Sequence, residues 1–188
     1  MCARTLTGLI LLVATTGGLL VTQFASSASE KEKPAHAAPE FTHSNPQAWI
    51  NSPPLKLADL RGQVVLLDFW TFDCWNCYRS FPWLKSVESQ FADREFTVVG
   101  IHTPEFQHER VRANVVGKVK QFMLDHAVMM DNDYSYWKAM GNRYWPTFYL
   151  IDKQGRVRAM YIGETHVGER RAKAIEAQIT QLLAEQPS

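Results

Sequence analysis

Cysteine is scarce in this sequence of 188 residues, which contains only Cys2, Cys74 and Cys77. A structural zinc site needs four ligands, usually a second cysteine pair or closely spaced histidines. No second pair is available here. The histidines weighed as partners form no tight pair; they are His102, His108, His126 and His166. The sequence therefore predicts no metal site.

Strong charge imbalance and internal repeats are also lacking. The formal net charge is +1, from 20 basic and 19 acidic residues, and no long basic block occurs. This balance argues against nucleic acid as a partner. Hydrophobic residues make up 46% and aromatic residues 12%, which suits one well-packed globular domain.

The apolar run at the N-terminus predicts export. Arg4 precedes the run Leu6–Val21, and the small residues of "FASSAS" follow it. This is the order of a signal peptide, which would be cut after Ala28 and would remove Cys2. The run is short for a membrane span of about 20 residues, so an uncleaved anchor is the alternative. We expect a periplasmic or other extracytoplasmic protein, with residues 1–28 as signal peptide or membrane anchor.

The rest of the chain divides into a linker and a domain. Residues 29–46 are rich in Ala, Ser, Pro and charge, which predicts a flexible linker. In residues 47–186, apolar runs predict strands at 64–70, 96–102, 128–130, 147–151 and 156–162. Helical patterns cover 74–91, with Pro82 inside, 109–126, 134–140 and 169–183. This alternation predicts an α/β fold with a central mixed β-sheet flanked by helices.

The stretch "VVLLDFWTFDCWNC" carries the chemistry, because Cys74 and Cys77 follow a buried strand and open a helix. A CxxC pair is a redox pair, half a zinc site or a structural disulfide. A disulfide that closes so short a loop restrains an unfolded chain little. A helix N-terminus favours a Cys74 thiolate, which would form a mixed disulfide with a partner. Cys77, one turn on, could then attack the Cys74 sulfur and release the partner. We therefore expect thiol–disulfide exchange through a redox-active Cys74–Cys77 disulfide, without another cofactor.

Several motifs resemble one superfamily. "LLDFWTFDCWNC" resembles the thioredoxin strand before CxxC, and "YWPTFYLID" resembles the thioredoxin cis-proline loop. "LADLRGQVVLLDFW" is similar to exported TlpA/ResA-type redoxins. "FWT..C.NC", "GIHTPEF", "DNDYSYW" and "YWP" together resemble the thioredoxin-like domain of DipZ-type thiol–disulfide interchange proteins. The resemblance covers about residues 49–165 and implies a thioredoxin-like domain with an N-terminal extension.

The resemblance also implies roles for particular residues. Asp68 would be buried behind the cysteines and move the Cys77 proton, although a strand carboxylate can instead point outward at a sheet edge. Pro146 would follow a cis bond and face Cys74. The substrate-contacting residues would be Trp75, Asn76, Trp145 and Thr147. For Trp75 and Trp145, and for neighbouring Tyr144, simple packing is the alternative. Glu105, after a strand end, is a further candidate or only a charge near the next helix.

The implied partners are proteins that carry disulfides or dithiols, with the chain acting as a reductase. DipZ-type proteins contain a membrane electron-transfer module that these residues lack, so we expect a separate membrane thiol carrier. Two rival functions exist. Thr71 and Cys74 form the T-x-x-C of peroxiredoxins, but Leu67 stands where those have Pro. A copper chaperone would use both cysteines and a histidine.

Overall fold

The structure is a computed structural model that describes residues 36–186. The predicted signal peptide or anchor, with Cys2, lies outside the described residues. Within residues 36–186, no helix combines the length and the apolarity that crossing a membrane requires.

The most apolar run of the domain forms the centre of a β-sheet. Strand β3 (Val64–Trp70) is buried at every position. It pairs in parallel with β4 (Phe96–His102) and antiparallel with β6 (Thr147–Ile151). A strand with neighbours on both sides and cover on both faces needs a continuous apolar sequence. The three predicted strand ranges are confirmed.

The remaining strands extend the sheet on both sides. Strand β7 (Arg156–Ile162) forms an antiparallel hairpin with β6, and β5 (Ala127–Met130) lies parallel to β4. Two-residue strands complete it, β1 (His36–Ala37) and β2 (Trp49–Ile50). In the described residues the strand order is β1-β7-β6-β3-β4-β5-β2. The predicted mixed sheet is confirmed.

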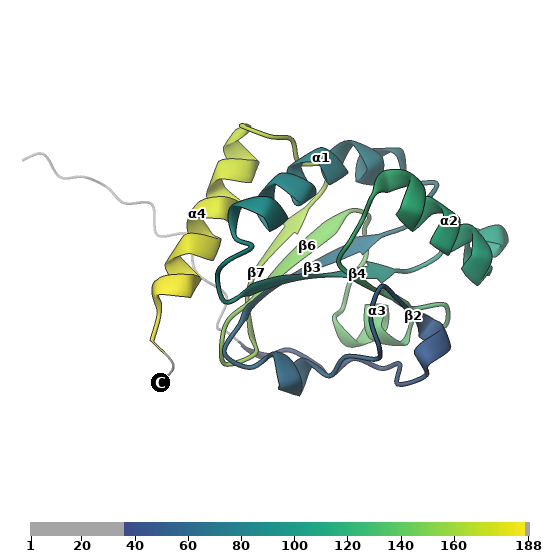
Figure 1. The fold of residues 1–188 in the computed structure, drawn as a ribbon, viewed down its shortest axis with the longest axis horizontal. Coiled ribbons are helices and arrows are strands. Elements are labelled where there is room, and N and C mark those ends of the chain that lie inside the picture. The colour runs from purple at the N-terminus through teal and green to yellow at the C-terminus, as the bar shows by residue number, and fades with distance from the viewer. Residues whose placement is uncertain (1–35, 187–188) are drawn as a thin grey trace, which may run out of the picture. The chain divides into compact units, whose positions relative to one another are not determined.

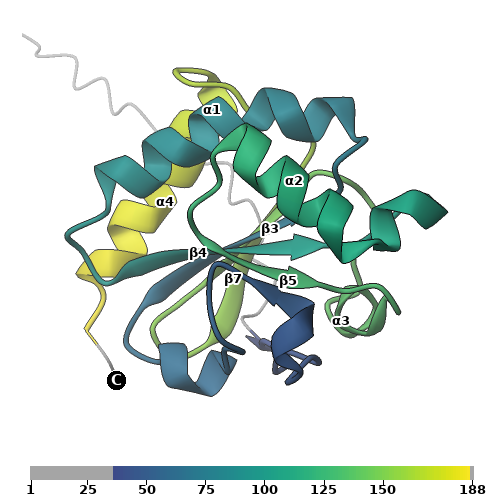
Figure 2. The same ribbon diagram turned by 45° about the vertical axis from the view of Figure 1, so that its right-hand side comes forward.

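Helices cover both faces of this sheet, as Figures 1 and 2 show. On one face lie α1 (Trp75–Gln90), α2 (Arg112–Phe122) and α4 (Arg170–Ala184). Their apolar residues form a single buried cluster with the sheet, and this cluster includes Cys77. The short α3 (Ser135–Ala139) packs on the other face with a second cluster.

The predicted helix at 109–126 is interrupted. Residues Gln107–Arg110 form a separate 3₁₀ turn, and Val111 is extended before α2 begins. The helix then ends at Met123, which has a left-handed backbone (φ 54°). The cause of the first break is Glu109, whose side chain accepts hydrogen bonds from the preceding loop and so holds a tight turn.

The prediction of a flexible linker through residue 46 is wrong for residues 36–46, which belong to the folded domain. Strand β1 pairs with β7. Phe41 is buried, with its ring 5.4 Å from that of Trp49 and 5.2 Å from that of Tyr136. The Glu40 carboxylate accepts hydrogen bonds from the N–H groups of the turn at residues 57–58. The composition of residues 36–46 resembles that of a linker, but the Phe41 ring and the Glu40 carboxylate anchor the segment to the domain.

Candidate functional site

The two cysteines form a disulfide at the start of α1. Their Cα atoms lie 5.3 Å apart. Cys74 is the N-cap residue, and its sulfur accepts a hydrogen bond of 3.2 Å from the Cys77 N–H. Cys77 is buried, whereas Cys74 is partly exposed. A sulfur at a helix N-terminus that already accepts a backbone N–H is well placed to carry negative charge.

The two residues between the cysteines face solvent. The Trp75 side chain is 68% exposed, and Asn76 is also exposed. The packing alternative for Trp75 is therefore wrong: its ring and that of Tyr78 lie edge to face, with ring centres 6.4 Å apart, and most of the indole faces solvent. An exposed indole beside a reactive sulfur provides apolar surface for a partner.

Asp68 is buried in the middle of β3, and the alternative of an outward carboxylate at a sheet edge is wrong. It lies at the centre of the sheet, is 1% exposed, and shares a sheet face with Trp70 and the cluster that contains Cys77. Neither of its oxygens has a hydrogen-bond partner within residues 36–186. Burial raises the pKa of Asp68 from 3.8 to about 7, and a nearby His126 opposes this rise. A carboxyl group with a pKa near 7 can both accept and release a proton at neutral pH.

The loop before β6 has the predicted backbone, because the Trp145–Pro146 bond is cis. Trp145 packs against the same apolar cluster as Cys74. Among the described residues, the Trp145 N–H and C=O have no hydrogen-bond partner, whereas the carbonyl of Pro146 accepts from Gly163. Free main-chain groups on Trp145 could pair with an extended peptide.

The flanks of this loop differ in exposure. Tyr144 is 54% exposed, so its packing alternative is wrong. Trp145 is partly buried and stacks near Trp137, with ring centres 4.4 Å apart. Thr147 is fully buried, and its hydroxyl donates to the Tyr144 carbonyl at 2.7 Å. The Thr147 side chain thus shapes the loop from inside and is not on the surface that a substrate would meet.

A buried acid, Glu109, lies near the CxxC loop. The sequence analysis did not identify it and named Glu105 as the candidate instead. Glu109 is fully buried, and one of its oxygens accepts from the Thr71 hydroxyl (2.5 Å) and the Asp73 N–H (3.0 Å). The other accepts from the N–H groups of Glu105 and Phe106. The Glu105 side chain itself is exposed. Glu109 therefore ties the loop before Cys74 to the loop after β4, and its position after a strand end was the available signal.

The hydroxyl of Thr71 bears on the peroxiredoxin alternative. Its single proton goes to Glu109 and is therefore not available to a Cys74 sulfur. His102 lies 3.4 Å from the same hydroxyl, and burial lowers the pKa of His102 to about 4, so its imidazole is neutral. The threonine of the T-x-x-C pattern is therefore part of the buried hydrogen-bond network around Glu109.

Ser80 stands where TlpA/ResA-type proteins often have Glu. It is buried one turn after Cys77, donates to the Asn76 carbonyl at 2.9 Å and accepts from the Thr165 N–H at 3.0 Å. The hydroxyl thus joins the first turns of α1 to the loop that follows β7.

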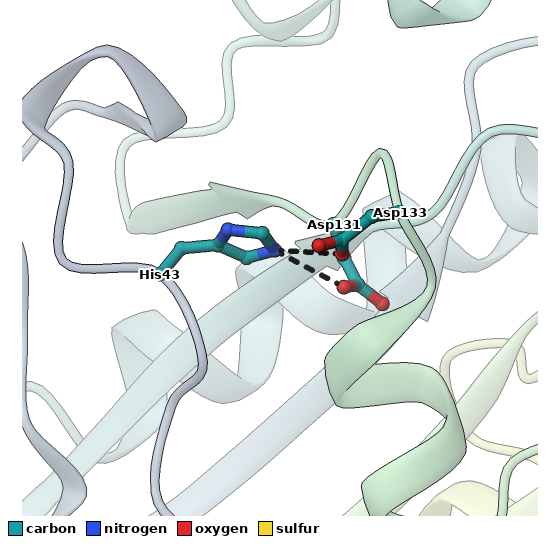
Figure 3. A group of neighbouring side chains, drawn as sticks. All are labelled: His43, Asp131 and Asp133. Carbon is teal, nitrogen blue, oxygen red and sulfur yellow. Dashed lines mark hydrogen bonds and ion pairs between the residues drawn. The ribbon is translucent and has the colours of Figure 1, made fainter.

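One group of side chains has the composition of a metal site, away from the cysteines. His43 lies within 3.3 Å of Asp131 and 3.2 Å of Asp133 (Figure 3). The buried Asp131 carboxylate also accepts from the N–H groups of Tyr136 and Trp137, at 3.0 and 2.8 Å. These backbone bonds hold the Asp131 carboxylate in place, and the contacts of the His43 ring with Asp131 and Asp133 fasten the N-terminal segment to the start of α3.

Comparison with known proteins supports the resemblance. The model of the AhpC/TSA family matches residues 34–160. Protein DipZ of Mycobacterium tuberculosis is 40% identical over 119 residues, which are 62% of this chain and 17% of DipZ. Thiol-disulfide oxidoreductase YkuV of Bacillus subtilis is 25% identical over 78% of this chain and 94% of its own length. The chain thus spans less than a fifth of DipZ but nearly all of YkuV.

A solved structure agrees with the fold. A crystal structure described as a putative thiol:disulfide interchange protein DsbE from Chlorobium tepidum matches with a TM-score of 0.69 and 25% identity. The match covers 81% of this chain and 99% of that one. The predicted thioredoxin-like α/β fold is confirmed.

Proposed function

The chain belongs to the AhpC/TSA family of thioredoxin-like redoxins and is a homologue of thiol–disulfide oxidoreductases, and from this premise we propose that it reduces disulfides of protein partners outside the cytoplasm. The observation that carries the proposal is the arrangement at α1. A partly exposed Cys74 caps the helix, a buried Cys77 follows one turn later, and a buried Asp68 lies on the same face of the sheet.

The reaction begins with the reduced pair. The Cys74 thiolate attacks one sulfur of a partner's disulfide, and the partner's other sulfur leaves as a thiolate that takes a proton from solvent. Cys77 then passes its proton to Asp68 and attacks the Cys74 sulfur. The Cys74–Cys77 disulfide forms, the partner leaves with both of its sulfurs reduced, and a separate membrane thiol carrier returns two electrons to the pair.

The surface around Cys74 suits a protein substrate. Exposed Trp75 and Tyr144 offer apolar contact area, and Asn76 offers hydrogen bonds. The free main-chain groups of Trp145 would pair with an extended segment of the partner, beside the cis Pro146.

Two matched cysteine variants test this division of labour. Cys74→Ser should abolish insulin disulfide reduction, because no nucleophile remains. Cys77→Ser should keep the first attack and accumulate mixed disulfides through Cys74. Mass spectrometry of trapped adducts identifies the cysteine used; adducts on Cys77 in the Cys74→Ser variant, with activity retained, would contradict the proposed roles.

Export through residues 1–28 is part of the same proposal. A reporter enzyme that is active only outside the cytoplasm, fused after Ser188, should be active. The same fusion without residues 1–28 is the control and should be inactive. An inactive full-length fusion that is expressed normally would refute export.

A further inference from the structure

Buried polar groups without partners gather beneath α1, on the sheet face that carries Cys77. The group comprises both oxygens of Asp68, the indole N–H of Trp70 and Nε2 of His126; none has a hydrogen-bond partner within residues 36–186. All three side chains are nine-tenths or more buried. Buried polar atoms in native proteins are nearly always satisfied by protein or by ordered water.

Gly100 lets two of these groups approach the backbone next to Asp68. A Cβ atom at this position would lie 3.0 Å from Trp70 Nε1 and 3.1 Å from His126 Nε2. Gly100 is also the β4 partner of Asp68 on β3, so the two residues point to the same face. A side chain at residue 100 would crowd Trp70 and His126, so glycine allows both unpartnered groups to lie beside the strand position that pairs with Asp68. A buried water needs two to four polar partners, and the unpartnered atoms of Asp68, Trp70 and His126 could supply them.

The other side of the His126 ring leads to solvent. Its Nδ1 lies 3.0 Å from Oε1 of Glu88 on α1. The Glu88 side chain is 26% exposed, whereas that of His126 is 2% exposed. Both residues line a pocket of about 270 Å³ with the exposed residues Ala92 and Asp125. The imidazole therefore separates the interior at Gly100 from a pocket at the surface, with one nitrogen on each side.

We propose that His126 and Glu88 are positioning residues that relay the Asp68 proton to solvent, through a buried water bound by Asp68, Trp70 and His126. This inference rests on the proposed function and adds the path by which Asp68 is reset after each turnover. The path leaves the domain between α1 and the start of β5, away from the surface on which a partner protein would cover Cys74.

The step conserves protons and electrons. When Cys77 attacks, its S–H proton goes to Asp68, the Cys74–Cys77 bond forms, and the bond from Cys74 to the partner breaks. The partner sulfur leaves with the electron pair of that bond. Asp68 then gives its proton, through the water, to Nε2 of His126, while Nδ1 passes its own proton to Glu88. Glu88 releases that proton into the surface pocket.

The charges near Asp68 are consistent with this path. The side chains whose charges act most on Asp68 are His126, from the loop before β5, and Glu88, from α1. A protonated His126 favours the Asp68 carboxylate, and an ionised Glu88 favours the protonated acid. Cys77, also on α1, is the remaining titratable group of the buried cluster on this face when the pair is reduced.

Ellman's reagent separates the two chemical steps in the full reduced chain. Attack by Cys74 releases a first equivalent of thionitrobenzoate, and resolution by Cys77 releases a second, both followed by stopped-flow absorbance. The variants are Glu88→Gln and His126→Gln, with Glu88→Asp as conservative rescue. His43→Gln is the matched control, because that histidine also pairs with carboxylates but lies on the opposite sheet face.

We expect the first release to be unchanged and the second to slow roughly tenfold near neutral pH in both variants. This is less than the roughly 10²–10⁴-fold typical of general acid–base catalysis, because Asp68 itself remains in place. The pH at which the second release is half-maximal should fall in Glu88→Gln, since the Glu88 carboxylate raises the pKa of Asp68. Glu88→Asp should restore the rate. Because the Glu88 side chain is partly exposed, Glu88→Gln is expected to fold. It therefore tests the relay even if His126→Gln does not fold.

Three results would overturn parts of this scheme, and they are distinct. An unchanged second release in both variants would refute the relay and leave the proposed function intact. Equal slowing of both releases would indicate a structural effect and also refute it. Absence of the second release in the natural chain would refute the proposed function itself.

Discussion

The buried Asp68 should make the stability of the domain fall as pH rises. Its pKa is about 7 in the folded protein and 3.8 ordinarily. Below pH 3.8 the acid is protonated in both the folded and the unfolded chain and costs nothing. Between 3.8 and about 7 the unfolded chain releases the proton while the folded chain keeps it. Above about 7 both are ionised and the destabilisation is complete.

The magnitude follows from this difference. At about 1.36 kcal/mol per pH unit, the rise from 3.8 to about 7 corresponds to about 4 kcal/mol. Asp68→Asn carries no charge at any pH. Its free energy of unfolding should therefore exceed that of the natural chain by about 4 kcal/mol at pH 8 and by about 1 kcal/mol at pH 4.5.

Urea unfolding of the disulfide form at several pH values measures this, because neither cysteine then titrates. Asp93→Asn, at an exposed position, is the control and should show no such trend. A difference between Asp68→Asn and the natural chain that stays constant from pH 4.5 to 8 would refute the reasoning. The same variant should slow the resolution step, so stability would rise as activity falls.

Further expectations concern the loops and the surface. Glu109→Gln leaves buried donors without an acceptor and should lower the free energy of unfolding by about 3 kcal/mol, measured in urea; Glu105→Gln, at an exposed side chain, should change it little. Phe41→Ala should cost about 3 kcal/mol in the same assay, and no cost would mean that residues 36–46 do not belong to the domain. Trp75→Ala should raise KM for a protein disulfide and leave the unfolding midpoint unchanged; an unchanged KM would remove Trp75 from the partner surface.

The strand ranges could be predicted from the sequence where an apolar run between turn residues marks them. The ranges of β3, β4, β6 and β7 coincide with the predicted ones. Strands β3, β4 and β6 are apolar runs that the sheet buries, and β7 is marked by the turn residues that join it to β6. The helix predicted at 109–126 failed for a tertiary reason. Glu109 bonds to a loop that precedes it, and an apolar pattern cannot report such contacts.

The sequence analysis likewise identified some residues of the candidate site and not others. Cys74, Cys77 and the cis Trp145–Pro146 bond were recognisable, since local motifs carry them. The burial of Asp68 followed from its place in an apolar strand. Glu88 and His126 were missed because they come from a helix and a loop that are 38 residues apart in sequence. The packing of α1 and of the loop before β5 against the sheet brings them near Asp68.

The short strands β1 and β2 bear on self-association. Both come from residues 36–50, yet they lie at opposite edges of the sheet. Strand β2 covers the centre of β5, while β1 covers only the first residues of β7. An uncovered edge strand is a template for another chain, and Met160 and Ile162 on β7 are already exposed. A chain shortened to start after Pro46 would present all of β7 and should associate edge to edge with a second copy.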